Sequence, residues 1–197
     1  APDGTAYQTT YTYDSTTGDI YYVITISPTG TTTTTLTGTP NGSLQVAPDG
    51  TAYQSTYTYD SATGYTTYVT TISPTGTTTT PLTGQPSGSI HIAPDSTAYQ
   101  TAYDSTTDYT YVTAISPTGT TTTTLTGRPH GSLHIAPDGT AYQTTYTGNS
   151  TIGYTTYVTA ISPTETTTTL TGAPYDSPHI APDGTAYQTT YTYDSTT

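Results

Sequence analysis

Residues 47–54 read Ala-Pro-Asp-Gly-Thr-Ala-Tyr-Gln, and this octapeptide decides how the chain is organised. The string recurs, once with Ser in place of Gly, so that repeats start at Ala1, Ala47, Ala93, Ala136 and Ala181. These starts are 46, 46, 43 and 45 residues apart. A fixed period of about 20–50 residues is typical of solenoids, propellers and related arrays. The sequence therefore predicts a single repeat array over 1–197 whose last repeat is partial, and we expect the chain to be a piece of a longer or processed array.

The residues around each octapeptide predict four short strands. The first is expected at 89–92, with counterparts at 43–46, 132–135 and 177–180, and in the second repeat three more follow at 51–59, at 66–72 and in a threonine run ending at Leu82. Pro-Asp-Gly, residues 60–64 and Ser-Pro-Thr-Gly contain the residues that favour tight turns. A loop is expected after each threonine run, and in one of these loops His130 should face solvent.

Aliphatic side chains recur in columns on both faces of the expected sheets. The columns are Val23, Val69, Val112 and Val158; Ile26, Ile72, Ile115 and Ile161; and Leu36, Leu82, Leu125 and Leu170. Because both faces then need to be covered, consecutive sheets should stack face to face. The predicted fold class is all-β: a β-propeller built from repeated four-stranded antiparallel blades. Either about four blades close into a ring, with 177–180 completing the first repeat, or the chain is an open fragment of a larger propeller that is prone to self-association.

The composition favours order in spite of a shortage of aliphatic residues. Leu, Ile and Val make up only 22 of the 197 residues, whereas 62 are Thr and 22 are Tyr. Such a shortage is typical of disordered chains, but disorder usually comes with a high density of charge, and only 7% of this chain is charged. Thr and Tyr also favour strands. We therefore predict that the chain folds.

The charge and the absent residue types exclude several classes of function. The formal net charge is −12, and Arg128 is the only Lys or Arg, so no nucleic acid partner is expected. No stretch approaches the roughly 18 apolar residues of a membrane-spanning helix, so no membrane insertion is expected. The absence of Cys excludes disulfides, thiolate metal sites and a Cys nucleophile.

The stretch 89–99, Ser-Ile-His-Ile-Ala-Pro-Asp-Ser-Thr-Ala-Tyr, resembles the opening of NHL-type β-propeller blades. The whole repeat is also similar to tandem repeats of secreted and cell-surface mycobacterial proteins, including some associated with the PE family. This resemblance implies a propeller and export, and it carries no inherited ligand site. The chain departs from the NHL pattern because it lacks Trp, Phe and Lys and has Thr at many aliphatic positions.

One column of side chains is a candidate metal site. His91, His134 and His179 share it, and Gln45 takes the same place in another repeat. Imidazole is a common zinc ligand, so the column could bind a metal. Because one member is Gln, we favour a packing role between blades and expect no metal and no cofactor.

Aspartate and asparagine recur in the turns and loops. Asp3, Asp49, Asp95, Asp138 and Asp183 each supply a single carboxylate, which is too few for a calcium loop, and we expect them to form the turns. Asn41 and Asn149 each fit the N-glycosylation sequon. The threonine runs fit either O-glycosylation or, as we favour, an outer strand kept soluble by its hydroxyls.

No repeat differs from its siblings as a grafted active site should, and Glu165 is the only Glu, so we expect no enzyme activity. The predicted function is a non-catalytic repeat module, secreted or at the cell surface, that serves as a structural or adhesive scaffold. Tyr rings and hydroxyls suit contact with a protein or a carbohydrate ligand. The alternative is a propeller hydrolase or metal-binding protein that uses the histidine column.

Overall fold

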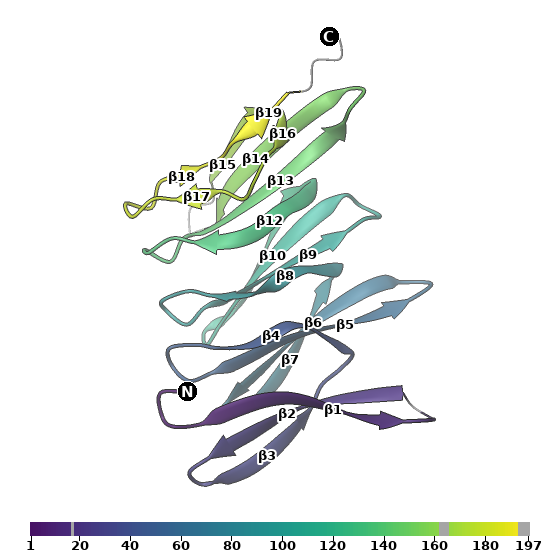
Figure 1. Cartoon of the computed structure of the whole chain (residues 1–197), viewed down its shortest axis with the longest axis vertical. Coiled ribbons are helices and arrows are strands. Elements are labelled where there is room, and N and C mark those ends of the chain that lie inside the picture. The colour runs from purple at the N-terminus through teal and green to yellow at the C-terminus, as the bar shows by residue number, and fades with distance from the viewer. Residues whose placement is uncertain (17, 162–165, 193–197) are drawn as a thin grey trace.

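The computed structural model describes residues 1–16, 18–161 and 166–192, and these form strands and turns without a helix. The strands make sheets that stack one on another along the longest axis of the molecule, with β1 near one end and β19 near the other (Figure 1). Within each of the four larger sheets, neighbours in sequence pair antiparallel in chain order. The prediction of an all-β chain built from repeated antiparallel sheets is therefore confirmed.

The sheets are numbered here along the chain. Sheet 1 has three strands: β1 (Ala6–Asp14), β2 (Gly18–Ser27) and β3 (Gly30–Thr35). Sheet 2 contains β4 (Thr39–Val46), β5 (Ala52–Asp60), β6 (Gly64–Ser73) and β7 (Gly76–Thr83). Sheet 3 contains β8 (Gln85–Ile92), β9 (Ala98–Asp104), β10 (Tyr109–Ser116) and β11 (Gly119–Thr126). Sheet 4 contains β12 (Arg128–Ile135), β13 (Ala141–Asn149), β14 (Gly153–Ile161) and β15 (Thr166–Thr171).

Two short ladders follow sheet 4 at the C-terminal end of the stack. β16 (Ala173–Pro174) pairs with β19 (Thr190–Tyr191), and β17 (His179–Ile180) pairs with β18 (Ala186–Tyr187). The strand expected at 177–180 is thus shorter than predicted. It also does not complete the first repeat, because its partner is β18 and sheet 1 lies at the opposite end of the stack (Figure 1).

The turns form as the sequence predicts. In every Pro-Asp-Gly or Pro-Asp-Ser turn the Asp Oδ1 accepts a hydrogen bond from the backbone N–H two residues later, at 2.9–3.0 Å. In the Ser-Pro-Thr-Gly turn of sheet 2, Ser73 Oγ donates to Gly76 O at 3.1 Å. The recurrent Asp side chains therefore close their own turns, as Asx turns do.

The first strand of each complete sheet is longer than predicted. β8 begins at Gln85, and β12 begins at Arg128, so the expected loops are strand. The register shifts within β4, β8 and β12, because each contains a bulge at a glycine with positive φ that lets the strand continue. His130 was expected in a solvent-facing loop. It lies instead in β12, half buried, with its ring edge-on to Tyr146 at 6.1 Å between centroids.

The threonine runs form the fourth strand at the edge of each sheet, and most of their side chains are exposed. Fourth strands with mostly hydroxyl side chains present little apolar surface to water, which suits an edge position. The edge position that we expected for these runs is confirmed, and the role of the hydroxyls in keeping the strands soluble stays a prediction.

The apolar core lies between the sheets. One cluster joins sheets 1 and 2 and includes Val23, Leu36 and Ile72; a second joins sheets 2 and 3; a third joins sheets 3 and 4. The isoleucine column shows the effect of stacking, because Ile72 is 5% exposed in sheet 2 whereas Ile26 is 50% exposed in sheet 1. Each sheet is therefore covered by its neighbours, as the columns predicted.

A buried glutamine ladder adds polar contacts to this core. Gln143 is fully buried, and its Nε2 donates to Thr144 O in its own strand at 2.9 Å. Its Oε1 accepts from Thr101 Oγ1 of the preceding sheet at 3.0 Å. Equivalent rungs join Thr9 to Gln54 at 2.8 Å and Thr144 to Gln188 at 2.7 Å. The rungs satisfy a buried amide and tie successive sheets together.

One rung of the ladder is not formed within the described chain. The residue after the octapeptide glutamine is Ser55 in sheet 2, whereas it is Thr in the other sheets. By the pattern of the other rungs, the partner of Ser55 would be Gln100 of sheet 3. Ser55 Oγ and Gln100 Oε1 are both buried and lack a hydrogen-bond partner. The smaller serine thus leaves two polar atoms unpaired at the centre of the stack.

Candidate functional site

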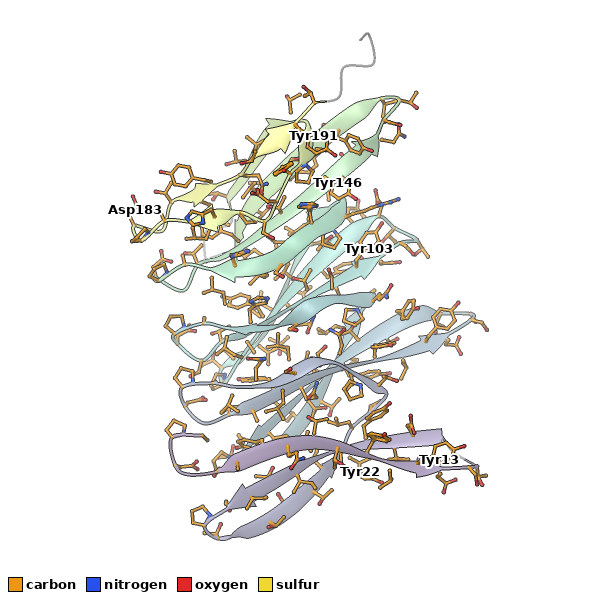
Figure 2. The ribbon with its side chains drawn as sticks, in the orientation of Figure 1. Tyr13, Tyr22, Tyr103, Tyr146, Asp183 and Tyr191 are labelled. Carbon is orange, nitrogen blue, oxygen red and sulfur yellow. The ribbon has the colours of Figure 1, made fainter. Side chains whose placement is uncertain are left out.

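A tyrosine stands three residues after the octapeptide glutamine in every repeat. We call this set the tyrosine row: Tyr11, Tyr57, Tyr103, Tyr146 and Tyr191. Figure 2 shows Tyr103, Tyr146 and Tyr191 towards one side of the stack, whereas Asp183 lies at the other side. The second strand of each repeat places its tyrosine near the hairpin that leads to the third strand, so stacking the sheets aligns the rings.

Other rings flank most members of the tyrosine row. Tyr11 lies 5.8 Å from Tyr21 between ring centroids, and Tyr57 lies 6.0 Å from Tyr65. Tyr146 lies 6.1 Å from Tyr154, and Tyr191 lies 6.4 Å from Tyr175. These pairs are tilted or edge-on, which are favourable geometries for aromatic contact. The row is therefore an aromatic surface with flanking rings. Three of its side chains are half buried, and Tyr11 is the most exposed at 62%.

The hairpins beside the row carry carboxylates. These are Asp14, Asp19, Asp60, Asp104 and Asp108. Backbone N–H groups of Ala62 and Thr63 donate to Asp60 and lower its pKa, and the Thr106 hydroxyl and backbone N–H lower the pKa of Asp104. Both groups therefore stay ionised at neutral and mildly acidic pH. The side of the stack that bears the row is acidic as well as aromatic.

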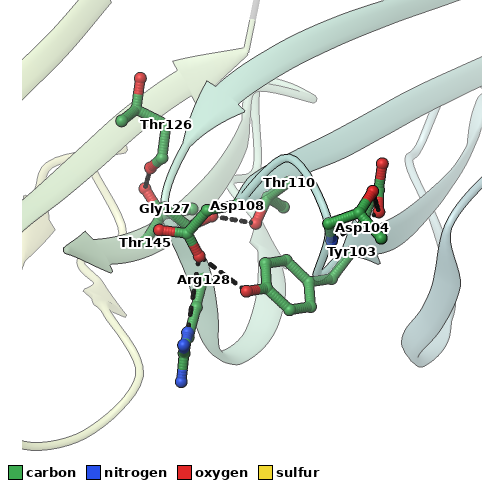
Figure 3. A network of polar contacts seen from close by, with 9 residues as sticks. Tyr103, Asp104, Asp108, Thr110, Thr126, Gly127, Arg128 and Thr145 are labelled. Carbon is green, nitrogen blue, oxygen red and sulfur yellow. Dashed lines mark hydrogen bonds and ion pairs between the residues drawn. The ribbon is translucent and has the colours of Figure 1, made fainter.

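Tyr103 belongs to a small polar network that joins sheets 3 and 4 (Figure 3). Its hydroxyl donates to Asp108 Oδ1 at 2.7 Å, and Arg128 Nε lies 3.5 Å from the same oxygen. Burial and the neighbouring Asp108 raise the pKa of Tyr103. The ion pair is largely exposed, so it contributes little stability and mainly orients the ring.

The histidine column forms a row on the first strands. His91 lies in β8, His134 in β12 and His179 in β17, and these strands pack against one another in that order. Burial, with a smaller contribution from the next histidine along the row, lowers the pKa of His91 and of His134. Within the described residues, no group of three or more His, Asp or Glu side chains could hold a metal ion. Metal binding by this row stays the alternative hypothesis.

The two sequon asparagines differ in their surroundings. Asn41 lies half buried in β4, and its Nδ2 donates to Gly88 O of sheet 3 at 2.7 Å. Asn149 is exposed in the hairpin after β13, and its Oδ1 accepts from Thr151 N at 2.9 Å. Asn149 is thus the more accessible of the two candidate glycosylation sites.

No family of known proteins matches the chain, and no curated protein matches it. In the part of the chain that the structure describes, no helix is long and apolar enough to cross a membrane. The likeness to NHL blades and to mycobacterial surface repeats stays a hypothesis.

The tyrosine row was not predicted as a site. Its signal was present, because the spacing of three residues from glutamine to tyrosine is the same in all five repeats. The spacing alone indicates the column of tyrosines. It does not indicate the surface around them, because the flanking rings and the acidic hairpins belong to other parts of the chain.

Proposed function

We propose that the chain is a non-catalytic, exported interaction module whose contact surface is the tyrosine row. The observation that carries the proposal is the alignment of one tyrosine per repeat, flanked by rings and carboxylates. An aromatic and acidic surface attracts Lys and Arg side chains, because the ring face is electron-rich and the carboxylates add charge complementarity. The expected partner is therefore a protein with an exposed cluster of Lys or Arg.

Export to the exterior or cell surface is part of this proposal. Support comes from exposed strands rich in hydroxyls and from the likeness to secreted repeats. We also propose that the stack is an arc of an NHL-like β-propeller. The first strands of neighbouring sheets pack directly on each other, β4 on β8 and β8 on β12, whereas fourth strands contact inner strands of the next sheet. A Cβ on Gly42 would lie 2.5 Å from Ser89 Oγ, so the first strands approach as closely as a hub requires.

The contact surface is tested by titrating the chain with a soluble peptide of alternating Arg and Gly and following the Tyr ring resonances. We expect saturable binding that weakens with salt. Replacing Tyr57 and Tyr103 by Leu should weaken binding about threefold per ring, whereas Phe at both positions should retain it. Tyr187→Leu is the matched control, because Tyr187 is exposed at the other end of the sheets. Equal binding by the Leu and Phe variants would overturn the proposal.

The alternative function, metal binding by the histidine row, needs its own experiment. Zinc is titrated into the chain and into the double variant His91→Gln, His134→Gln, which introduces the residue found at Gln45. Tight, stoichiometric uptake that the double variant loses would favour the alternative over a scaffold without metal.

A further inference from the structure

Two equivalent grooves lie between successive sheets, near the Pro-Asp-Gly turns. Groove 1, about 610 Å³, lies between sheets 1 and 2, and groove 2, about 600 Å³, lies between sheets 2 and 3. Both volumes fall within the range of about 300–1,000 Å³ that is usual for small-ligand sites. Groove 2 repeats most of the lining of groove 1: Asp49 corresponds to Asp3, Thr71 to Thr25 and Pro117 to Pro74.

The linings are rich in hydroxyls. In groove 2 the third strand contributes Thr71 and Ser73, the edge strand contributes Thr78 and Thr80, and the next sheet contributes Ser116. A hydroxyl both donates and accepts hydrogen bonds, as the hydroxyls of a sugar do. No Lys or Arg lines either groove, and the chain is strongly acidic, so an anionic ligand would be repelled.

Each groove contains a polar atom that the described chain leaves unpaired. Thr25 Oγ1 and Thr71 Oγ1 are buried and have no hydrogen-bond partner. Both side chains are partly exposed and line the grooves, so a rotation about χ1 can turn the covered hydroxyl towards a ligand in the groove. A buried hydroxyl without a partner costs free energy, which a ligand hydroxyl would recover.

Later sheets lack this feature. The position of Thr25 and Thr71 is Ala114 in sheet 3 and Ala160 in sheet 4. The groove that follows sheet 4, about 470 Å³, is lined by Val158, Ala160 and Leu170. That groove also has hydroxyls in its lining, such as those of Thr166 and Thr168, so grooves 1 and 2 differ from it in having an unpaired threonine hydroxyl.

We infer that grooves 1 and 2 bind neutral carbohydrate, with Thr25 and Thr71 as equivalent contacts. The apolar faces of a sugar ring pack against the proline of the next Ser-Pro turn, Pro74 or Pro117, which are both exposed. The carboxylates of Asp3 and Asp49 accept hydrogen bonds from sugar hydroxyls. Because stacked sheets lie about 10 Å apart, one extended oligosaccharide can occupy both grooves at once. This site is separate from the tyrosine row.

The test uses isothermal titration of the whole chain with cellohexaose, maltohexaose and chitohexaose. We expect saturable binding of at least one of them. Thr71→Val and Thr25→Val should each weaken it, and the double variant should weaken it about tenfold or more, as loss of ligand hydrogen bonds does. Thr71→Ser should retain binding. Thr121→Val, an exposed threonine outside both linings, is the matched control.

Unfolding by urea separates binding from folding. Because its hydroxyl is unpaired, Thr71→Val should leave the stability unchanged or raise it. Failure of all three oligosaccharides to bind, or equal affinity in the wild type and the Thr25→Val, Thr71→Val variant, would overturn the inference. Loss of sugar binding on Tyr57→Leu but not on Thr71→Val would place the sugar on the tyrosine row and would overturn it as well. Failure of the chain to bind the peptide of Arg and Gly would count against the tyrosine row as a contact surface, and it would leave the carbohydrate inference untouched.

Discussion

Gln100 and Gln143 occupy equivalent buried positions, and they differ in whether the side-chain carbonyl oxygen accepts a hydrogen bond. Gln143 Oε1 accepts from Thr101 Oγ1, whereas Gln100 Oε1 faces Ser55 and is unpaired. Leaving a buried polar atom without a partner costs about 1–3 kcal/mol. Most of the ladder is thus satisfied, and its one defect is traceable to one missing methyl group.

We predict that Ser55→Thr stabilises the chain by about 1 kcal/mol, because the added methyl group restricts the χ1 rotamers and favours the one in which the hydroxyl donates to Gln100, as the threonines of the other rungs do. The site has room for threonine, since Thr101 and Thr144 are buried at the equivalent positions. Urea unfolding at neutral pH measures the change. Thr101→Val is the reverse control and should destabilise by about 1–3 kcal/mol, because it leaves Gln143 Oε1 unpaired. A destabilised Ser55→Thr chain would contradict the ladder.

The histidine row predicts a dependence of stability on pH. The folded-state pKa values of His91 and His134 are lowered below the ordinary histidine value of 6.5, chiefly by burial. The unfolded chain therefore binds more protons as the pH falls through this range, and stability decreases with it. The contribution of these two neutral histidines to the free energy of unfolding is fully present above pH 6.5, and it is lost as the pH falls through their folded-state pKa values.

Unfolding free energies at neutral pH and at about pH 5 measure this loss. The double variant His91→Gln, His134→Gln should show a flatter profile in that interval, because Gln does not titrate. The lowered pKa values of Asp3 and Asp60 act only near and below 3.8, so they do not mask the effect. A double variant with the same slope as the wild type would refute the assignment.

At the scale of the strands, the sequence predicted the hairpins well and the first strands poorly. Asp49 and Ser73 sit in turns whose residues favour one local geometry, so the second, third and fourth strands appeared where expected. The first strands were cut short because Gly88 reads as a loop signal, although its positive φ forms a bulge within β8. The grooves were not predictable, since they depend on how far neighbouring sheets separate.

The connection between sheets 3 and 4 is a single glycine, Gly127, which lies between β11 and β12. Gly127 passes over β13, and a Cβ built on it would lie 2.3 Å from Tyr146 O. Its carbonyl accepts from Thr110 Oγ1 at 2.7 Å, and its N–H donates to Asp108 O at 2.9 Å. The crossing between sheets therefore has room only for glycine.

We predict that Gly127→Ala destabilises by roughly 2–5 kcal/mol, because a positive-φ penalty of about 1–2 adds to an overpacking cost of about 1–3. Gly139→Ala is the matched control: its φ is +90°, but no heavy atom lies within 4 Å of the added Cβ. That variant should lose only about 1–2 kcal/mol. Thermal unfolding followed by circular dichroism compares them, and equal losses would refute the steric argument.

At the scale of the whole molecule, stability is distributed along the stack. Each of the three apolar clusters joins two neighbouring sheets, as in repeat proteins whose units contact only their neighbours. The columns of Val, Ile and Leu allowed this stacking to be predicted from the sequence. They did not determine whether the stack closes, because closure depends on a small rotation between sheets that the residue pattern does not encode.

The stacked arrangement itself is tested most directly by distances between spin labels. The chain has no Cys, so paired substitutions label it cleanly. Thr16, Ala62, Thr106 and Thr151 are exposed at the tips of four corresponding hairpins. From a sheet spacing of about 10 Å, we predict narrow distance distributions near 20 Å for the pair Thr16→Cys, Thr106→Cys and near 30 Å or more for Thr16→Cys, Thr151→Cys. A Thr16–Thr151 distance no longer than the Thr16–Thr106 distance, as in a closed four-membered ring, or broad distributions for both pairs, would contradict the account.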